Sequence, residues 1–318
     1  MFRYAKVKAI TIIVVILVAL IGLFVFVGEE IGRAKAAREA TLSVAQSERS
    51  GMNVLVMGSD RTTGLTDVMM LVRMNSDGRL AVMQIPRDTY ARYTDGNYKK
   101  LNGAYNYFGN GDDVRDLLSN AFGIVIDRYI MLSPDGFRDA VDALGGVEVE
   151  LDRTFYYDDP YQNFTVYLQK GKHLLDGEKA EQFVRYRSGY VNGDLGRIDA
   201  QKVFMRAVMD KASNSLSPVK AVSLAMSLIG KTDTDVGADD IAFFISFLRE
   251  YDSEKAVMLT APGEAVTAKK SGASYYSLSY METKKAIDDY FGVRCGEFDR
   301  NGLFLNPSNE DFKRIYYR

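Results

Sequence analysis

The chain has 318 residues, a formal net charge of −2, one cysteine and one histidine. This charge balance argues against nucleic-acid binding, which usually needs a basic face, and the lone Cys295 excludes an intrachain disulfide and a zinc site of several thiolates. Any Ser-His-Asp triad would have to use His173, whose loop-like context between Lys172 and two leucines indicates a structural role.

The N-terminal region contains one apolar segment, residues 9–28, in which only Thr11 breaks the run. A helix of this length spans roughly 30 Å, the thickness of the hydrocarbon core of a bilayer. Arg3, Lys6 and Lys8 precede the segment, and basic residues on the short side favour a cytoplasmic N-terminus. A cleaved signal peptide is the alternative, but its apolar core would be shorter, about 7–15 residues. The sequence therefore predicts a single-pass protein of the cell membrane with an extracellular C-terminal domain.

The predicted anchor divides the chain into segments of unequal length. Residues 1–8 form the expected cytoplasmic tail, and residues 9–28 the transmembrane helix. Residues 29–50 are polar and alanine-rich, which is typical of a helical stalk or a plain linker. Residues 51–318 are then one extracellular domain of the α/β class.

Three short apolar runs open this domain, at residues 54–57, 68–74 and 80–85. Each is rich in Val, Ile, Leu and Met and is bounded by turn-forming residues, so each predicts a buried strand. Charged residues stand where these strands begin or end: Asp60, Arg61, Asp67, Arg87 and Asp88. Because ligands of open α/β sheets bind outside the ends of strands, this set indicates a site for a metal ion and a phosphate.

Helical and strand patterns alternate through the rest of the chain. Helices are expected at residues 112–122, 134–144, 177–184, 195–211, 218–229, 239–251 and 281–291, and strands at 129–132, 147–151 and 256–259. Asp112 or Asp113 is the expected cap of the first helix, and Ser133 precedes a proline at the start of the second. The spacing of strand 129–132, its helix and strand 147–151 predicts a parallel βαβ unit. The acidic and aromatic residues 152–163 are expected to form a surface loop.

A second polar group lies in and before the long helix at residues 195–211. Its core-facing stripe follows helical spacing: Ala200, Val203, Phe204, Ala207 and Val208. Arg197 and Gln201 lie along the edge of this stripe, so they are expected to point toward the rim of the core. A half-buried guanidinium needs an anionic partner, either a phosphate at the helix N-terminus or a core carboxylate.

Two further pairs have the spacing of ligand-binding residues. In an extended segment, Arg185 and Arg187 would face one side with Tyr186 opposite, and could bind two phosphate groups; a solvated surface pair is the alternative. Asp60 and Asp67 are candidate ligands of Mg²⁺, which typically takes one or two carboxylates beside substrate phosphates. Aspartates that stabilise turns are the alternative here.

A series of motifs follows in order between about residues 53 and 211: GSDR, TDVMML, IPRDTY, KLNGAY, DALGGV, LDGEKA, VRYR and GDLGRIDAQK. Together they resemble the LytR-CpsA-Psr family, and a weaker resemblance continues through Pro262-Gly263-Glu264 to the last predicted helix. The resemblance implies a three-layer αβα domain with a mixed central sheet, which holds a polyprenyl tail in an apolar cleft. Leu117, Leu118, Phe122 and Phe137 are candidate cleft residues that fit an ordinary core equally well.

The resemblance also implies an activity. Members move a glycopolymer from a polyprenyl-pyrophosphate carrier to peptidoglycan, typically to the 6-hydroxyl of muramic acid, and so form a phosphodiester link. The expected partners are the carrier-linked glycan, peptidoglycan and the membrane. Two alternatives use the same site: water as acceptor would give a polyprenyl-pyrophosphate phosphatase, and absence of turnover would leave a lipid- or wall-binding protein.

Carried over residue by residue, the resemblance assigns roles within the site. Asp60 and Asp67 would bind Mg²⁺, with Mn²⁺ as an alternative. The pyrophosphate would contact Arg87, Lys100, Arg185, Arg187, Arg197 and Gln201. Arg87 and Asp88 belong to one motif, and either Asp60 or Asp88 would accept the proton of the attacking hydroxyl. Many members carry Arg-Ser-Asp where this chain has Leu65-Thr66-Asp67, and Arg61 is the candidate for the missing charge.

Overall fold

The computed structural model describes residues 50–60, 64–93, 98–159, 164–186, 194–215, 232–292, 296–297, 299, 302–305 and 312–314. The expected anchor at residues 9–28, the expected helix at 218–229, Arg61 and Arg187 lie outside these ranges. Within them, no helix combines the length and the apolar character that crossing a membrane requires.

A six-stranded sheet forms the centre of the domain, in the order β11-β6-β1-β2-β3-β12. Its strands are β1 (Gly51–Ser59), β2 (Thr66–Asn75), β3 (Leu80–Gln84), β6 (Arg128–Leu132), β11 (Asp233–Thr234) and β12 (Val257–Thr260). β2 pairs antiparallel with both β1 and β3, and β11 with β6, whereas β6 runs parallel to β1 and β12 parallel to β3. The predicted mixed sheet is confirmed.

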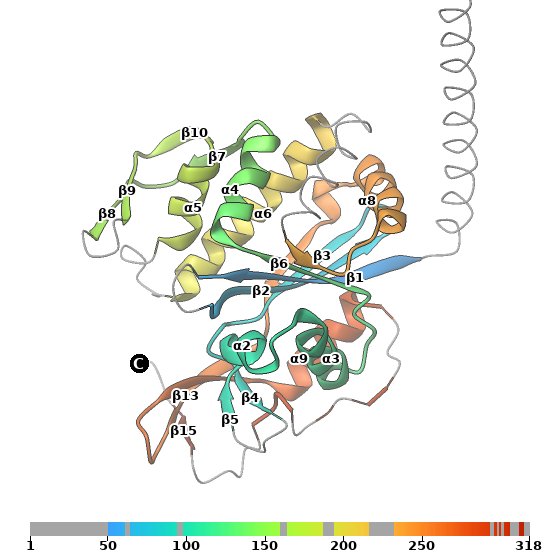
Figure 1. Cartoon of the computed structure of the whole chain (residues 1–318), viewed down its shortest axis with the longest axis vertical. Helices are drawn as coiled ribbons and strands as arrows, with labels where there is room; N and C mark the ends of the chain where they lie inside the picture. The colour runs from blue at the N-terminus through green and yellow to red at the C-terminus, as the bar shows by residue number, and fades with distance from the viewer. Residues whose placement is uncertain are drawn as a thin grey trace, which may run out of the picture. The chain divides into compact units, whose positions relative to one another are not determined.

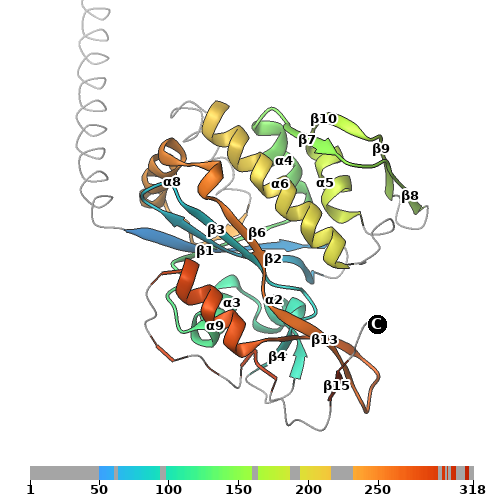
Figure 2. The ribbon, with the colours of Figure 1, turned by 180° about the vertical axis from the view of Figure 1, so that it is seen from behind.

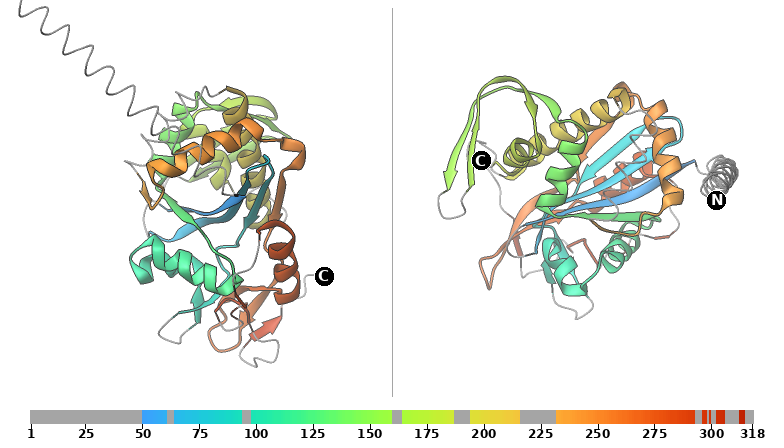
Figure 3. Two further views of the ribbon diagram at one scale, coloured as in Figure 1. Left: turned by 90° about the vertical axis from the view of Figure 1, so that its right-hand side faces the viewer. Right: turned by 45° about the horizontal axis from the view of Figure 1, so that its top comes forward.

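Helices cover both faces of this sheet (Figures 1 and 2). They are α2 (Ala104–Phe108), α3 (Gly111–Phe122), α4 (Pro134–Ala143), α5 (Gly177–Arg185), α6 (Asp194–Ser215), α8 (Ala238–Glu250) and α9 (Tyr280–Tyr290). Side chains of a strand alternate between faces, so Met52 and Val54 pack with Phe247 of α8, whereas Leu55 packs with Phe122 of α3. The left view of Figure 3 shows α8 and the pair α3 and α9 on opposite sides of the sheet.

Local capping explains where two of the helices begin. Pro134 occupies the first position of α4 as predicted, and Ser133 caps the helix, because its side chain accepts a hydrogen bond from the Gly136 amide. The cap predicted for α3 was wrong: Asn110, rather than Asp112 or Asp113, accepts from the Asp113 amide. The two aspartates instead occupy the first turn, where negative charge favours the helix dipole.

The predicted parallel βαβ unit was wrong. β7 (Val147–Leu151) follows α4 but pairs antiparallel with β10 (Gly171–Leu175) in a separate two-stranded sheet. The parallel partner of β6 is β1. The residues of β7 alternate between buried valine or leucine and exposed glutamate, a pattern of a sheet with one solvent-facing side rather than of a central parallel strand.

The surface loop predicted at residues 152–163 was also wrong. β8 (Phe155–Asp159) pairs antiparallel with β9 (Phe164–Leu168), and one side of this hairpin is buried. His173 lies in β10 rather than in a loop. Val203, predicted to face the core from α6, is 51% exposed. The apolar side of the hairpin and the buried residues of β7 pack on α5 and α6 as one cluster.

The remaining short elements lie on the α3 and α9 side of the sheet (Figure 1). They are β4 (Tyr90–Arg92), β5 (Tyr98–Lys100), the 3₁₀ turn η1 (Leu101–Gly103), β13 (Gly263–Ala268), β14 (Ser274–Leu278) and β15 (Phe312–Arg314). A second 3₁₀ turn, η2 (Ser253–Lys255), precedes β12. The pairing of β4 with β5 is important for the site, because it returns Lys100 to the end of β3.

Candidate active site

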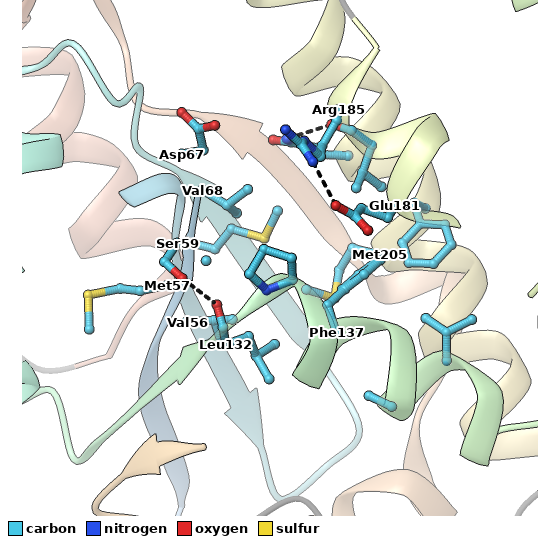
Figure 4. Close-up of a pocket in the computed structure, with 18 of the residues that line it drawn as sticks. Val56, Met57, Ser59, Asp67, Val68, Leu132, Phe137, Glu181, Arg185 and Met205 are labelled. Carbon is cyan, nitrogen blue, oxygen red and sulfur yellow. Dashed lines mark hydrogen bonds and ion pairs between the residues drawn. The ribbon is translucent and has the colours of Figure 1, made fainter. Parts of the chain in front are cut away.

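An apolar cavity lies between one face of the central sheet and the helices α4, α5 and α6. Most of its lining is aliphatic or aromatic: Val56, Val68, Met70, Leu132, Pro134, Phe137, Ala140, Val141, Leu144, Val184, Phe204, Met205 and Val208. Figure 4 shows Val56, Phe137 and Met205 surrounding this space, with the charged side chains of Asp67, Glu181 and Arg185 together at one end. The cavity therefore has an apolar interior and a charged end.

Of the four candidate cleft residues, Phe137 lines the cavity. Leu118 and Phe122 are fully buried in the core on the opposite face of the sheet, and Leu117 packs against that core. Phe137 of α4 therefore faces a cavity, whereas the three candidates on α3 belong to ordinary core.

Two carboxylates stand at the mouth of the cavity, as the positions of the strands predict. Asp60 directly follows β1, and Asp67 is the second residue of β2, so the antiparallel pairing of the two strands brings them to the same end of the sheet. Asp60 is joined to the residues that precede β2 by two hydrogen bonds: its amide donates to Leu65 O at 2.9 Å, and its Oδ1 accepts from the Gly64 amide at 2.8 Å. Both aspartates line the cavity.

Asp67 also pairs with a predicted phosphate-binding residue. Arg87 Nη1 lies 2.6 Å from Asp67 Oδ1, and each side chain is about one-quarter exposed. Arg87 follows β3, which neighbours β2 in the sheet. This ion pair therefore lies beside the mouth of the cavity and connects the ends of the two adjacent strands.

A second ion pair extends this polar surface. Lys100 Nζ lies 3.0 Å from Asp88 Oδ1. The segments that carry them are held together by the Leu101 amide, which donates to Thr89 O, and the Asn102 amide, which donates to Arg87 O. Asp88 and Lys100 are not among the residues that line the cavity, so the structure places them beside Arg87 rather than at the cavity itself.

Arg185 lies across the mouth from Asp67 (Figure 4). The prediction that it belongs to an extended segment was wrong, because Arg185 is the last residue of α5, and the backbone becomes extended only at Tyr186. Its Nη1 donates to Glu181 Oε1 at 2.7 Å, and the other carboxylate oxygen of Glu181 pairs with Arg138 of α4. Arg187 is outside the described residues.

Sequence reasoning missed Glu181, a carboxylate that is 2% exposed and lines the cavity. The available signal was its position four residues before Arg185 in a predicted helix, a spacing at which a glutamate and an arginine face each other. Such pairs are normally on the surface, so the spacing alone does not reveal that this one is buried.

The first turns of α6 supply the last two predicted residues. Arg197 and Gln201 are 2% and 4% exposed, and both line the cavity, which confirms that they point inward. Gln201 Nε2 donates to Val184 O at 3.0 Å, and its Oε1 accepts from Gln84 Nε2 at 2.7 Å. Gln201 therefore connects α6 with α5 and with β3, which fixes the helix end that carries Arg197.

Comparisons with known proteins identify the family of the chain. The model of the LytR_cpsA_psr family matches residues 27–290. A relative from Oceanobacillus iheyensis, named polyisoprenyl-teichoic acid–peptidoglycan teichoic acid transferase TagU, is 28% identical over 264 residues, which are 80% of each chain.

Two solved structures extend the likeness to the fold. The crystal structure of B. subtilis TagV has 25% sequence identity and a TM-score of 0.65, over 76% of this chain and 99% of that one. A structure described as TagT bound to LIIa-WTA has 26% identity and a TM-score of 0.62, over 77% and 92% of the two chains. The chain therefore belongs to the LytR-CpsA-Psr family.

Proposed function

We propose that this protein transfers a glycopolymer from a polyprenyl-pyrophosphate carrier to the 6-hydroxyl of muramic acid in peptidoglycan, forming a phosphodiester link. One observation carries the proposal: an apolar cavity opens at a mouth that holds three carboxylates and two arginines, namely Asp60, Asp67, Glu181, Arg185 and Arg197. A lipid with a charged head group needs this combination, because its tail gains from leaving water and its phosphates gain from fixed cations. The name of the TagU relative describes the same class of transfer.

The position of the arginines supports binding of the pyrophosphate at the mouth. Arg197 is buried at the start of α6 and Arg185 ends α5, so both approach one end of the cavity from the helix side. Guanidinium groups form paired hydrogen bonds with phosphate oxygens. The tail of the carrier would then extend along Phe137, Phe204 and the other apolar residues of the lining.

Asp60 and Asp67 fit a divalent cation shared with the substrate. Mg²⁺ typically takes one or two carboxylates and completes its shell with water and phosphate oxygens, and Mn²⁺ accepts similar ligands. Among the described residues, no group of three or more His, Cys, Asp or Glu side chains could hold a metal ion on its own. When bound, the ion would neutralise charge that develops on the phosphates.

The residues of the chain then have separate roles in the transfer. The muramic hydroxyl attacks the sugar-proximal phosphorus, a new P–O bond forms, and the bond from that phosphorus to the polyprenyl phosphate breaks. Arg185, Arg197 and Arg87 hold the phosphates and stabilise their charge. Either Asp60, which lines the cavity and would also bind the ion, or Asp88, whose carboxylate is paired with Lys100, accepts the hydroxyl proton.

The carrier lipid also gives the N-terminal segment a role. A polyprenyl substrate is confined to the membrane, so an enzyme that acts on it gains from being anchored there. Residues 9–28 would supply that anchor, with the N-terminus in the cytoplasm and residues 51–318 outside.

The direct test is to incubate the full-length protein with a polyprenyl-pyrophosphate-linked sugar, Mg²⁺ and peptidoglycan oligomers. Mass spectrometry should detect a muramic-acid phosphodiester, and Asp67→Ala should abolish it. Release of the same amount of polyprenyl phosphate without peptidoglycan would instead identify a phosphatase. Binding of the lipid with neither product would identify a lipid-binding protein.

A further inference from the structure

The β8–β9 hairpin exposes one face that the proposed transfer does not use. This outer hairpin face consists of Tyr156, Asp158, Thr165, Tyr167 and Gln169, all of which are exposed. The alternating residues, among them Phe155 and Val166, are buried on the other side. Tyr156 and Tyr167 are 64% and 60% exposed, far more than most of the chain's described tyrosines. The right view of Figure 3 shows the hairpin at the edge of the domain.

The exposed side chains are held in a defined arrangement. Tyr156 and Tyr167 are paired across the two strands, and their rings meet edge to face with centroids 6.3 Å apart. Gln169 Nε2 donates to the Tyr167 hydroxyl at 2.9 Å, and on the next pair Thr165 Oγ1 donates to Asp158 Oδ1 at 2.8 Å. A surface whose side chains are already ordered loses less conformational entropy when it binds a ligand.

The hairpin is braced on the helix that ends at the proposed phosphate site. The Phe155 ring lies 5.0 Å from the Tyr186 ring and 5.5 Å from the Phe183 ring. Tyr186 directly follows Arg185, and its hydroxyl donates to Tyr156 O at 3.4 Å. The strand that carries Tyr156 is therefore joined by direct contacts to the residue that follows Arg185 of the cavity mouth.

The chemistry of this face suits a sugar chain with an uncharged backbone. Tyrosine rings offer a flat apolar surface with a polar tip, which matches the apolar face and the hydroxyl rim of a pyranose. The amide, hydroxyl and carboxylate groups beside them supply both donors and acceptors. The outer hairpin face carries one anionic side chain, Asp158, and no cationic one, so it disfavours a polymer rich in phosphate.

We propose that the outer hairpin face binds the glycan strand of peptidoglycan, the acceptor, and presents it to the mouth of the cavity. This inference rests on the proposed function, because it takes peptidoglycan to be the acceptor. The donor glycopolymer is bound through its lipid and pyrophosphate at the cavity, so each substrate has its own binding surface.

The test uses the full-length protein and the double variant Tyr156→Ala/Tyr167→Ala. Both side chains are exposed, so their removal costs only the modest stabilisation of their cross-strand pair and should lower the melting temperature by a few degrees at most. Sedimentation with purified insoluble peptidoglycan should show binding about tenfold weaker than that of the unmodified protein, because exposed tyrosines that become buried in a contact dominate binding. The variant Tyr156→Phe/Tyr167→Phe should retain most of the binding. Tyr290→Ala, which removes a 40% exposed tyrosine from α9, is the matched control.

Kinetics separate this proposal from the proposed function. The double alanine variant should raise the KM for peptidoglycan about tenfold and leave the KM for the lipid carrier unchanged. If the double alanine variant and the unmodified protein bind peptidoglycan equally and have the same KM for it, the role of the hairpin is overturned. The proposed transfer activity would not be affected by that result. Retention of hairpin-dependent peptidoglycan binding without any transfer would overturn the function instead. Loss of binding to an anionic glycopolymer, or to vesicles of anionic phospholipid, with peptidoglycan binding intact would assign the face to those partners and overturn the proposal.

Discussion

Glu181 Oε1 accepts a hydrogen bond from Arg185 Nη1 at 2.7 Å, one turn along α5. The second carboxylate oxygen pairs with Arg138 of α4, and the Glu181 side chain is 3% exposed. A carboxylate buried to this degree is costly unless it is paired, and the two guanidinium groups offset that cost. In return it fixes the direction of Arg185 at the cavity mouth, which makes Glu181 a positioning residue for pyrophosphate binding.

Glu181→Gln should raise the KM for the lipid carrier by roughly tenfold or more, because a hydrogen bond to a charged group contributes about 1.5–3 kcal/mol. Arg185→Ala should abolish transfer without unfolding the domain. If Glu181 acts through Arg185, the double variant should be no worse than Arg185→Ala alone, since the two effects are not independent. Steady-state kinetics with the carrier varied measure Glu181→Gln, and isothermal titration of the carrier compares binding by the double variant with binding by Arg185→Ala. Glu178→Gln, an exposed change on the same helix, is the control, and fully additive effects would contradict the positioning role.

Divalent metal should be required, and its binding can be measured separately from activity. A chelator should abolish transfer, and Mg²⁺ or Mn²⁺ should restore it. Electron paramagnetic resonance of added Mn²⁺, with the carrier lipid present, should show binding at least roughly tenfold weaker in Asp60→Asn and in Asp67→Asn, since even changes around metal ligands cost about 10–100-fold. Asp77→Asn, at the exposed turn between β2 and β3, should bind Mn²⁺ normally. Unchanged Mn²⁺ binding in both site variants would exclude the assigned ligands.

Alkaline pH should destabilise the domain through tyrosines that folding removes from water, and the partly buried Tyr276 is one of them. Burial foremost, and then the neighbouring Glu282, raises the pKa of Tyr276 to about 12, above the value of about 10 in an unfolded chain. The neutral form is therefore favoured by folding: its contribution is complete below about pH 10 and is lost as the pH rises toward 12. The Tyr276 hydroxyl donates to Ala261 O at 2.9 Å, and its backbone amide donates to Asp88 O beside the site.

Tyr276→Phe isolates this contribution from those of the other tyrosines. At pH 8 the variant should be less stable by about 1 kcal/mol, the usual net value of a hydrogen bond. Urea unfolding of both proteins should show that this difference shrinks between pH 10 and 12. A difference that stays constant over that range would show that Tyr276 does not titrate with folding.

Much of the fold can be predicted from local patterns in the sequence. The strands β1, β2 and β3 are continuous apolar runs, and α4 begins at a serine followed by a proline. β7 and the β8–β9 hairpin were harder to predict, because pairing partners are set by contacts between distant residues. Acidic residues such as Asp158 and Asp159 at one end of β8 also resemble a loop, although Phe155 is buried.

In the site, too, some features follow from local sequence patterns and others depend on tertiary packing. Asp60 and Asp67 could be predicted because each adjoins an apolar strand, but their convergence with Arg197 depends on how α6 packs against the sheet. The ion pair of Arg87 with Asp67 joins one predicted phosphate ligand to one predicted metal ligand. The spacing of these two residues in the sequence does not predict that they pair. Phe137 and Phe122 are both apolar residues of helices beside the sheet, and only the tertiary arrangement gives one of them a cavity and the other a core.

Filling the apolar cavity should weaken binding of long carriers more than short ones. Ala140 of α4 lines the cavity, and Ala140→Phe would place a ring where the lipid tail is proposed to lie. Because the benefit of burial scales with the apolar area that leaves water, a long polyprenyl carrier should lose at least about tenfold in affinity, whereas an analogue with one or two isoprene units should be little affected. Isothermal titration with carriers of different tail length measures this. Ala242→Phe, on α8 outside the cavity lining, controls for general effects of a bulky residue, and an equal loss for both tail lengths would place the lipid elsewhere.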